Sequence, residues 1–255
     1  MQTLKLQEGI IYGPVKSRRL GPSLGINLLP ASYKLCTFNC LYCHYGWTKR
    51  HTLDASSCLG DLPSIEQVRK SLADWLKRNR HPINYITFSG NGEPCLYPQF
   101  DEMVDVAIKT RDKFVPHAKL AILSNSTCLD NQRVQSGLRQ LDVKIMKLDC
   151  GTIEAFLKLN RPVPGVQFEK VVENLRKLDD IILQSVFVEG RVNNTEEDEV
   201  GKWMERLTYI KPNEVQIYSI DRPSADGDLA LVSKDKLNQI ARRAEQACGI
   251  PVRVF

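Results

Sequence analysis

Short apolar segments rich in β-branched residues alternate with amphipathic segments along most of this 255-residue chain, and no other feature constrains the fold as strongly. The expected strands are residues 25–30, 83–90, 120–126, 143–150, 181–190 and 214–221. Polar residues or glycine bound each of them, which is typical of buried parallel strands. Alternation of strands and helices predicts right-handed βαβ units and a parallel sheet.

The segments between these strands carry apolar residues at helical spacing. Ser64 and Gln67 form a capping-box pattern, which predicts the start of a helix. Helices are expected over residues 68–79, 98–114, 166–178, 195–210 and 233–248. Thr195 is expected to cap the fourth of them.

The number of these units predicts an α/β fold of a particular kind. A closed eight-fold barrel takes ~250 residues, whereas this chain supplies only about six βα units after its lead-in. We therefore expect a partial, open TIM-type barrel of parallel strands, with a lateral gap that could admit a large substrate. The sequence has no repeat or linker, so residues 1–255 are expected to form a single domain, with a basic lead-in (1–24) and the barrel (25–255).

The composition favours a cytoplasmic protein that does not contact a membrane. No apolar run approaches ~18 residues, and the segment MQTLKLQEGIIYGP lacks the apolar region of a secretory signal. In the cytoplasm, the eight cysteines are expected to be metal ligands or free thiols rather than disulfides.

The excess positive charge lies in the first part of the chain. Residues 1–53 carry seven Lys and Arg side chains and one acid, Glu8, whereas the whole chain has a net charge of +5. Such a patch favours an anionic partner such as nucleic acid. A solvated basic surface is the alternative.

The segment KLCTFNCLYCHYGW permits three metal chemistries. Cys40, Cys43 and His44 match the C-x-x-C-H attachment pattern of c-type haem. The same side chains, with Cys58, could close a structural zinc site. Alternatively, Cys36 joins Cys40 and Cys43 in the pattern C-x-x-x-C-x-x-C, which could hold an iron–sulfur cluster. Because a fully ligated [4Fe–4S] cluster uses four cysteines, three would leave one iron open to a small molecule.

With Tyr42 before its last cysteine, this segment resembles the cluster loop of the radical S-adenosylmethionine (SAM) enzymes. YGPVKSRRLGPSLGINLLP resembles the lead-in of a group of these enzymes that includes the wyosine synthases of tRNA. FSGNGEP resembles that group's glycine–glutamate motif, and LDCG and LNRP resemble its segments around the fourth strand. The resemblance covers nearly the whole chain and favours the cluster over zinc and haem.

The resemblance implies a [4Fe–4S] cluster on Cys36, Cys40 and Cys43, with SAM chelated to the open iron. Reductive cleavage of SAM would then yield a 5′-deoxyadenosyl radical that abstracts hydrogen from a substrate. A flavodoxin- or ferredoxin-type protein would be the low-potential electron donor. The expected substrate is anionic, with a tRNA base as the first candidate. A peptide or small metabolite is the alternative, and a non-catalytic zinc or iron–sulfur protein is the third hypothesis.

The resemblance and the positions of strand ends also indicate residues that bind SAM. These are Tyr42, Gly90, Gly92, Glu93, Ser124, Asn125, Asp149, Gln184 and Ile220. Glycine lets the backbone approach a ligand, and Glu93 could accept hydrogen bonds from the methionyl amine. Tyr42 would lie against the adenine and Asp149 would bind the ribose. Turn, capping and core roles are the alternatives.

Lys147 lies two residues before Asp149, so both side chains would point to the same side of a strand. A lysine inside a barrel is costly unless it is paired or used. It could act in catalysis by binding an anionic substrate or forming a Schiff base. A salt bridge with Asp149 is the alternative, and it would put the ribose role in doubt. Four arginines are candidates for binding a phosphate or carboxylate of the substrate, with surface ion pairs as the alternative: Arg18, Arg19, Arg161 and Arg222.

Three further cysteines, Cys95, Cys128 and Cys150, fall at or just past the ends of successive strands. They could hold a second iron–sulfur cluster or serve as active-site thiols, and small hydrophobic core residues are the alternative. By resemblance, wyosine synthases take their second cluster from cysteines upstream of the first. Here no cysteine precedes Cys36, which counts against a plain wyosine synthase.

Overall fold

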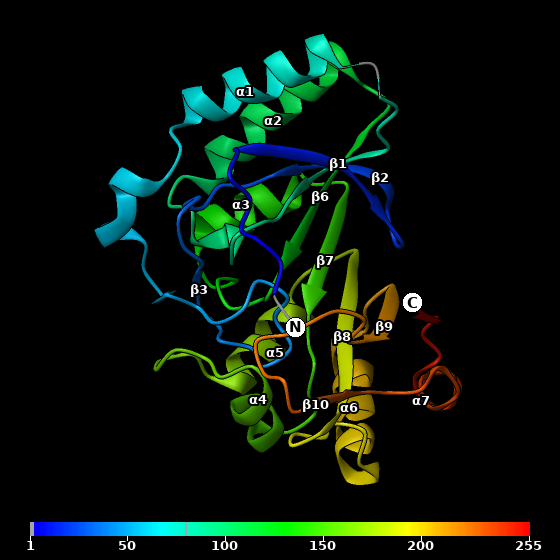
Figure 1. Cartoon of the computed structure of the whole chain (residues 1–255). Coiled ribbons are helices and arrows are strands. Elements are labelled where there is room, and N and C mark those ends of the chain that lie inside the picture. Colours follow the sequence, from blue (N-terminus) through cyan, green and yellow to red (C-terminus); the bar gives the residue numbers. More distant parts are fainter. Residues whose placement is uncertain (1–2, 80) are drawn as a thin grey trace.

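The structure is a computed structural model that describes residues 3–79 and 81–255, so residues 1 and 2 of the expected lead-in lie outside its described part. The main sheet has the strand order β1-β2-β5-β6-β7-β8-β9-β11, with β10 paired to β8 (Figure 1). Its strands are β1 (Ile11–Ser17), β2 (Gly21–Ile26), β5 (Tyr85–Phe88), β6 (Lys119–Ser124), β7 (Val143–Lys147), β8 (Ile181–Gly190), β9 (Glu214–Ser219), β10 (Leu229–Leu231) and β11 (Val252–Val254).

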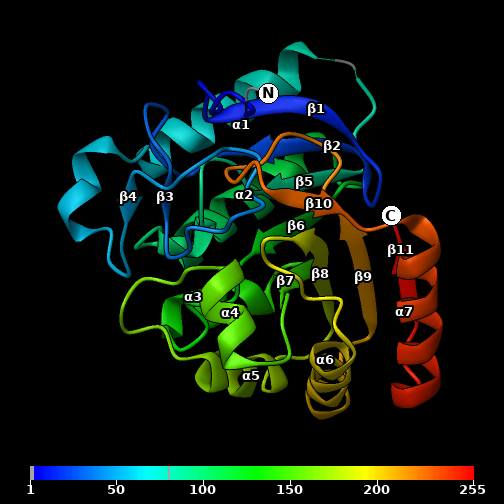
Figure 2. The same cartoon turned by 60° about the horizontal axis from the view of Figure 1, so that its bottom comes forward.

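The predicted α/β architecture with a mostly parallel sheet is confirmed. Five of the six expected strands are present, as β5 to β9. The first was expected at residues 25–30, but β2 lies earlier and shares only residues 25 and 26 with that range. These six strands pair in parallel in the order of the sequence. Phe88 of β5 lies between Ile26 of β2 and Ile122 of β6, which fixes the register at the start of the sheet. Within the described residues, β1 and β11 end the sheet without pairing to each other, so the sheet stays open (Figure 2).

Three strands of the main sheet were not expected from the sequence. β1 forms an antiparallel hairpin with β2 inside the predicted lead-in, and its register shifts between Tyr12 and Val15. Gly13 and Pro14 lie at this shift and interrupt the alternation by which a strand is recognised. β10 and β11 span three residues each, which is too short for a periodic signal.

The helices are α1 (Ile65–Arg78), α2 (Phe100–Phe114), α3 (Gln132–Arg139), α4 (Ile153–Leu159), α5 (Phe168–Arg176), α6 (Glu197–Ile210) and α7 (Lys234–Cys248). The capping box at α1 is confirmed, because Ser64 and Gln67 exchange both hydrogen bonds. The expected cap of α6 is wrong. The helix begins after Glu196, and the Thr195 hydroxyl instead donates to Asn193 Oδ1 at 2.8 Å.

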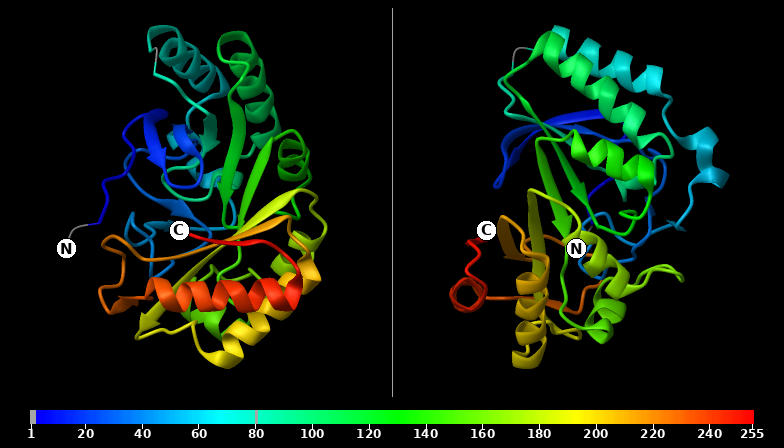
Figure 3. Two further views of the ribbon diagram at one scale, coloured as in Figure 1. Left: turned by 90° about the vertical axis from the view of Figure 1, so that its right-hand side faces the viewer. Right: turned by 180° about the vertical axis from the view of Figure 1, so that it is seen from behind.

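Successive helices pack side by side along the sheet: α1 on α2, α2 on α3, α5 on α6, and α6 on α7 (Figure 3). The core between the helices and the sheet includes Trp203 of α6, whose ring meets Phe187 of β8 edge-on at 5.1 Å. Because the parallel strands all point the same way, the segments that follow them leave from the carboxyl ends of the strands. The candidate site lies at these carboxyl ends. No helix in the described ranges has both the length and the apolar character needed to cross a membrane.

Candidate active site

The cysteine segment begins in β3 (Leu35–Cys36), which pairs with β4 (Arg50–His51) in a small separate sheet. Two turns follow, in which Cys43 N donates to Cys40 O at 3.2 Å and Gly46 N donates to Cys43 O at 3.1 Å. Leu35 also bridges to Gly92. The loop is therefore fixed against the glycine–glutamate motif.

Amide groups surround the first two thiols. Phe38 N donates to Cys36 Sγ at 3.4 Å, and Asn125 Nδ2 lies 3.5 Å from the same sulfur. Asn160 Nδ2 donates to Cys40 Sγ at 3.6 Å. Hydrogen bonds of this kind stabilise thiolates and tune the potentials of iron–sulfur clusters.

Burial makes these thiols poor thiolates in the absence of a metal. It raises the pKa of Cys36 to about 12 and that of Cys40 to about 11, although the charge of Lys34 opposes both shifts. Coordination to iron deprotonates a thiol outright. The donor set, three thiols on one loop with amide donors to sulfur, therefore fits an iron–sulfur cluster.

The glycines of the GNGEP motif allow two backbones to meet. Gly92 has a φ of +145°, and a Cβ atom there would lie 1.7 Å from Leu35 O. Gly90 has a φ of +129°, and its Cβ would lie 2.6 Å from Asn27 Oδ1. A side chain at either position would push the cysteine loop or the end of β2 away.

The carboxylate of Glu93 is buried in the wall of the site. Its Oε1 accepts from Cys95 N at 3.0 Å and from Ser124 Oγ at 2.9 Å, and its Oε2 accepts from Asn125 N at 2.6 Å. Burial raises the pKa of Glu93, although these hydrogen bonds oppose the shift. A carboxylate has about four acceptor positions, so one position on Oε2 remains for a ligand.

A cavity of about 180 Å³ lies between these groups, with Cys36, Tyr42, Glu93, Asn125, Lys147 and Gln184 among its lining residues. Gln184, on β8, is 7% exposed, and its Nε2 has no hydrogen-bond partner among the described residues. Gly92 and Ser124 also line the cavity, so the structure brings together eight residues from five segments that the sequence analysis singled out.

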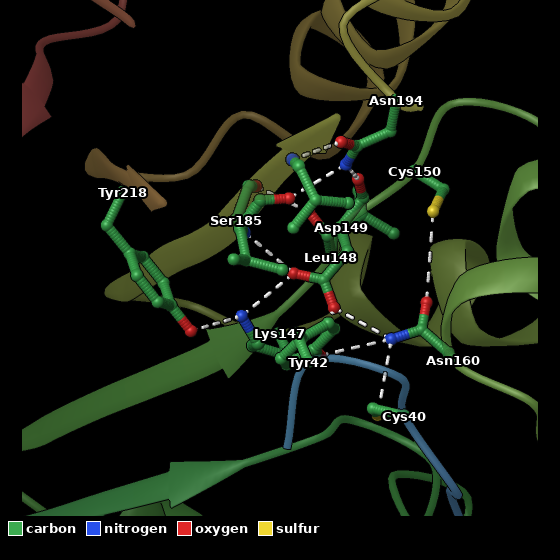
Figure 4. A network of polar contacts seen from close by, with 12 residues as sticks. Cys40, Tyr42, Lys147, Leu148, Asp149, Cys150, Asn160, Ser185, Asn194 and Tyr218 are labelled. Carbon is green, nitrogen blue, oxygen red and sulfur yellow. Dashed lines mark hydrogen bonds and ion pairs between the residues drawn. The ribbon is translucent and has the colours of Figure 1, made fainter. Parts of the chain in front are cut away.

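Lys147, at the end of β7, reaches into this cavity as part of a polar network (Figure 4). Its Nζ lies 2.8 Å from Asp149 Oδ1 and 2.8 Å from the hydroxyl of Tyr218, to which it donates. The ammonium also lies 4.9 Å from the centroid of the Tyr42 ring. Burial lowers the pKa of Lys147, but the negative charge of Asp149 and the interaction with Tyr218 outweigh it, so that the pKa is raised and the side chain stays a cation.

Asp149 has no acceptor position left for a ribose. Besides Lys147, its Oδ1 accepts from Val186 N at 2.9 Å. Its Oδ2 accepts from the Tyr42 hydroxyl at 2.5 Å and from Asn160 Nδ2 at 2.8 Å (Figure 4). The salt bridge that the sequence left as an alternative is the arrangement observed, and the structure offers no support for the ribose role.

Asn160 and Tyr218 were not identified from the sequence. Asn160 lies in the LNRP segment, whose resemblance pointed only to its arginine. Tyr218 is a strand residue with an ordinary strand pattern around it, so no local signal distinguishes it. The turn role left open for Ser124 and Asn125 is visible, because Ser124 Oγ accepts from Ser126 N at 3.1 Å and Asn125 Oδ1 accepts from Thr127 N at 3.1 Å. Both residues also hold the carboxylate of Glu93.

The three later cysteines do not form one group. Cys95 Sγ donates to Ser124 Oγ at 3.6 Å; burial and Glu93 raise its pKa, and Cys128 adds to the effect. Cys150 Sγ instead lies 3.8 Å from Asn160 Oδ1, and Cys40 contributes to its raised pKa after burial, Asp149 and Glu199. Cys95 and Cys128 line one cavity. Ser124 links Cys95 to the Glu93 side of the site, and Asn160 links Cys150 to the Cys40 side.

The zinc alternative finds no matching arrangement. His44 Nδ1 lies 3.3 Å from Pro223 O and its Nε2 3.7 Å from Asp221 Oδ1, while Cys58 packs in a separate apolar cluster. In residues 3–79 and 81–255, no three His, Cys, Asp or Glu side chains are placed to hold a single metal ion.

Three of the four candidate arginines gather beside the site. Arg18 pairs with Asp221 at 2.9 Å, and Arg222 lies 4.0 Å from the same carboxylate. The Arg19 guanidinium stacks over the Tyr218 ring at 4.2 Å. The fourth, Arg161, lies elsewhere, over the ring of Trp47 at 5.3 Å. Ile220 lines a different cavity from Glu93, one formed by the segment that follows β9.

The chain resembles known proteins in sequence. The family model described as "Radical SAM superfamily" matches residues 32–204. A UPF0026 protein of Helicobacter pylori (strain J99) is 30% identical over 221 residues, which are 85% of this chain and 68% of that protein. A GTPase Obg of Brachyspira hyodysenteriae is 28% identical over 254 residues, or 98% of this chain and 35% of that protein. The chain thus spans about a third of the length of that relative.

Solved structures share the fold at low identity. A radical SAM methyltransferase from Sphaerobacter thermophilus aligns with a TM-score of 0.64 and 11% identity over 91% of this chain and 65% of that chain. The structure of TYW1 with a lysine-pyruvate adduct bound aligns with a TM-score of 0.60 and 14% identity over 91% of this chain and 76% of that chain. The predicted partial-barrel fold is confirmed by these matches.

The chain belongs to the radical SAM superfamily, and it is an enzyme of that class. Membership implies a [4Fe–4S] cluster, SAM and a reductant. UPF0026 proteins are among its curated relatives.

Proposed function

We propose that this enzyme abstracts a hydrogen atom from an anionic substrate, with a base of tRNA as the first candidate. The observation that carries the proposal is the cationic Lys147 at the wall of the cavity. A lysine ammonium has three N–H donors, and Asp149 and Tyr218 use two of them. The third remains for a negatively charged or carbonyl oxygen of a ligand.

The cluster and SAM would supply one-electron reductive cleavage and hydrogen abstraction. The residues supply binding, orientation and exclusion of water. Cys36, Cys40 and Cys43 would hold the iron, and the unused acceptor position of Glu93 would bind the methionyl amine of SAM. Gly92 keeps the two loops close enough for both tasks. A donor of flavodoxin or ferredoxin type and a cytoplasmic location complete the proposal.

Lys147 is better suited to ion pairing than to carbonyl chemistry. The solved structure of TYW1 contains a lysine-pyruvate adduct, and the same chemistry here would require an uncharged amine. The raised pKa of Lys147, caused by Asp149 and Tyr218 against the effect of burial, disfavours that form. We therefore assign Lys147 to the binding of an anionic group.

Two observations favour RNA as the source of that group. The first is the concentration of Lys and Arg in residues 1–53, which include the β1–β2 hairpin and both strands of the small sheet. The second is the resemblance of residues 12–30 and of the GNGEP motif to the wyosine synthase group. Phosphates attract such surfaces, and the open sheet leaves room for a macromolecule at its edge.

Anaerobic reconstitution tests the enzyme activity. The protein should bind about four irons per chain for a single cluster and should convert SAM to 5′-deoxyadenosine when reduced. Comparison of nucleosides from tRNA of cells with and without the gene should show one that depends on it. A gene-dependent change confined to peptides or small metabolites would instead support the alternative substrate classes. Iron near eight per chain would indicate a second cluster.

Lys147→Gln tests the assignment of the anionic site. The variant should keep its iron and its uncoupled cleavage of SAM but lose turnover of the substrate. Lys158→Gln, on the surface of α4, is the matched control. Equal turnover in both variants would contradict the role of Lys147.

A further inference from the structure

A second buried lysine lies at the cysteine loop, and no role assigned so far uses it. Lys34 comes directly before β3 and is 5% exposed. Its Nζ donates to Gly46 O at 3.0 Å, inside the turn that follows Cys43. Its backbone carbonyl accepts from Arg50 N at 3.0 Å, which fixes the residue between β3 and β4.

The charge of Lys34 has no acidic partner among the described residues. None of the Asp or Glu side chains in residues 3–79 and 81–255 forms a salt bridge with it. Burial lowers the pKa of Lys34, but the nearby thiols of Cys43, Cys36 and Cys40 outweigh it, so that the pKa is raised. An unpaired buried ammonium is expensive, so a lysine is stable here only if negative charge is present nearby.

The three cysteines supply that charge when they bind iron. Three thiolates outweigh the positive charge of a [4Fe–4S] core in both oxidation states, and reduction adds one more electron. A fixed cation nearby therefore stabilises the reduced form more than the oxidised form. Net charge and hydrogen bonding to sulfur are among the factors that set cluster potentials.

We propose that the ammonium of Lys34 offsets the charge of the thiolate-bound cluster and raises its reduction potential, so that a biological donor can reduce it. The inference rests on the assignment of the cluster to Cys36, Cys40 and Cys43 in the proposed function. Lys34 contacts the cysteine loop and is not among the residues that line the cavity, so its effect is one of positioning and charge. Its buried site matters because a solvated charge is screened.

The test is the reduction potential of the cluster in reconstituted full-length protein, followed by electron paramagnetic resonance. Lys34→Met should lower the reduced-to-oxidised ratio at a fixed potential about tenfold, which is ~59 mV for a one-electron couple. Lys34→Arg keeps the charge and should stay close to the wild-type potential. Lys49→Met removes an exposed lysine from the same segment and should leave the potential unchanged.

Each outcome decides the question. If Lys34→Met has the same potential as Lys49→Met, the inference is wrong while the proposed function stands. If circular dichroism shows that Lys34→Met is folded but the variant binds no iron, the iron content of Lys34→Arg separates the effect of charge from that of shape. Iron binding restored by arginine supports the role of charge, and iron lost in both variants shows that shape alone matters. Wild-type protein that binds no cluster would defeat the proposed function itself.

Discussion

Lys147 and Asp149 hold opposite charges inside the barrel, and each leaves the other unpaired if it is removed. The Lys147 side chain is 13% exposed and that of Asp149 is 1% exposed. Lys147→Met should therefore lower the free energy of unfolding by about 3–5 kcal/mol. Lys147→Met with Asp149→Asn should recover most of that loss, because no buried charge then remains. Denaturant unfolding of the wild type and the variants measures both effects.

A control variant at an exposed ion pair tests this prediction. Lys177→Met removes an exposed i,i+4 pair with Glu173 and should cost at most about 1 kcal/mol.

The pH dependence of the free energy of unfolding tests the charge of Lys147. The pKa of Lys147 is raised above its ordinary 10.5, since Asp149 and Tyr218 outweigh burial. Its stabilising effect is complete below about 10.5 and is lost as the pH rises through the folded-state value. A difference between wild type and Lys147→Met that already falls near neutral pH would contradict a cationic Lys147.

The sequence predicted that several candidate residues lie near one another, and the reason is physical. The carboxyl ends of parallel strands meet at one edge, so Glu93, Asn125, Lys147 and Gln184 had to lie near one another. The contacts between individual side chains could not be predicted in this way. The partners of Asp149 come from the cysteine loop, β8 and the end of α4, and no periodic pattern records which donors reach a given carboxylate.

At the scale of elements, the junction between the cysteine loop and the GNGEP motif depends on a missing side chain. Gly92→Ala would place a Cβ 1.7 Å from Leu35 O at a φ of +145°. We expect it to displace the loop, reduce iron binding after reconstitution and destabilise the fold by more than 1 kcal/mol, on the order of other strained substitutions.

Gly201 provides the matched control. It lies within α6, and no atom comes within 4 Å of its ideal Cβ position. Gly201→Ala should therefore stabilise the protein by roughly 0.5–1 kcal/mol through helix propensity. Gly92→Ala should lower both the iron content and the unfolding temperature, whereas Gly201→Ala should leave the iron content unchanged and raise the unfolding temperature. Similar iron content in both would show that the contact at Gly92 is not needed for the loop.

Which elements could be predicted depended on their length and regularity. The long helices and the buried parallel strands carry strong periodicity and were found. α3 and α4 span eight and seven residues, about two turns each, so too few apolar positions repeat to be recognised. The β1–β2 hairpin was hidden by its irregular register, and Thr195 was misassigned because Asn193 competes for its hydroxyl.

At the scale of the molecule, positive charge and an open sheet occur in the same chain. If RNA binds along residues 1–53, the logarithm of its affinity should fall linearly with that of salt. Lys16→Ala with Arg50→Ala should reduce that slope by about 0.7 per lost phosphate contact. Lys109→Ala with Lys113→Ala, on α2, should not change it. Binding of bulk tRNA that is insensitive to salt would contradict an RNA substrate.

The carboxylate of Asp149 joins four stretches of chain that are distant in sequence, and this has a consequence for how such proteins diverge. Loss of any one donor leaves part of the buried carboxylate without an ion-pair or hydrogen-bond partner. Natural variants that lose the lysine at position 147 should therefore also replace the acid at 149 with a neutral residue. Substitutions at positions 147 and 149 should therefore occur together among related sequences, even where exposed residues vary independently.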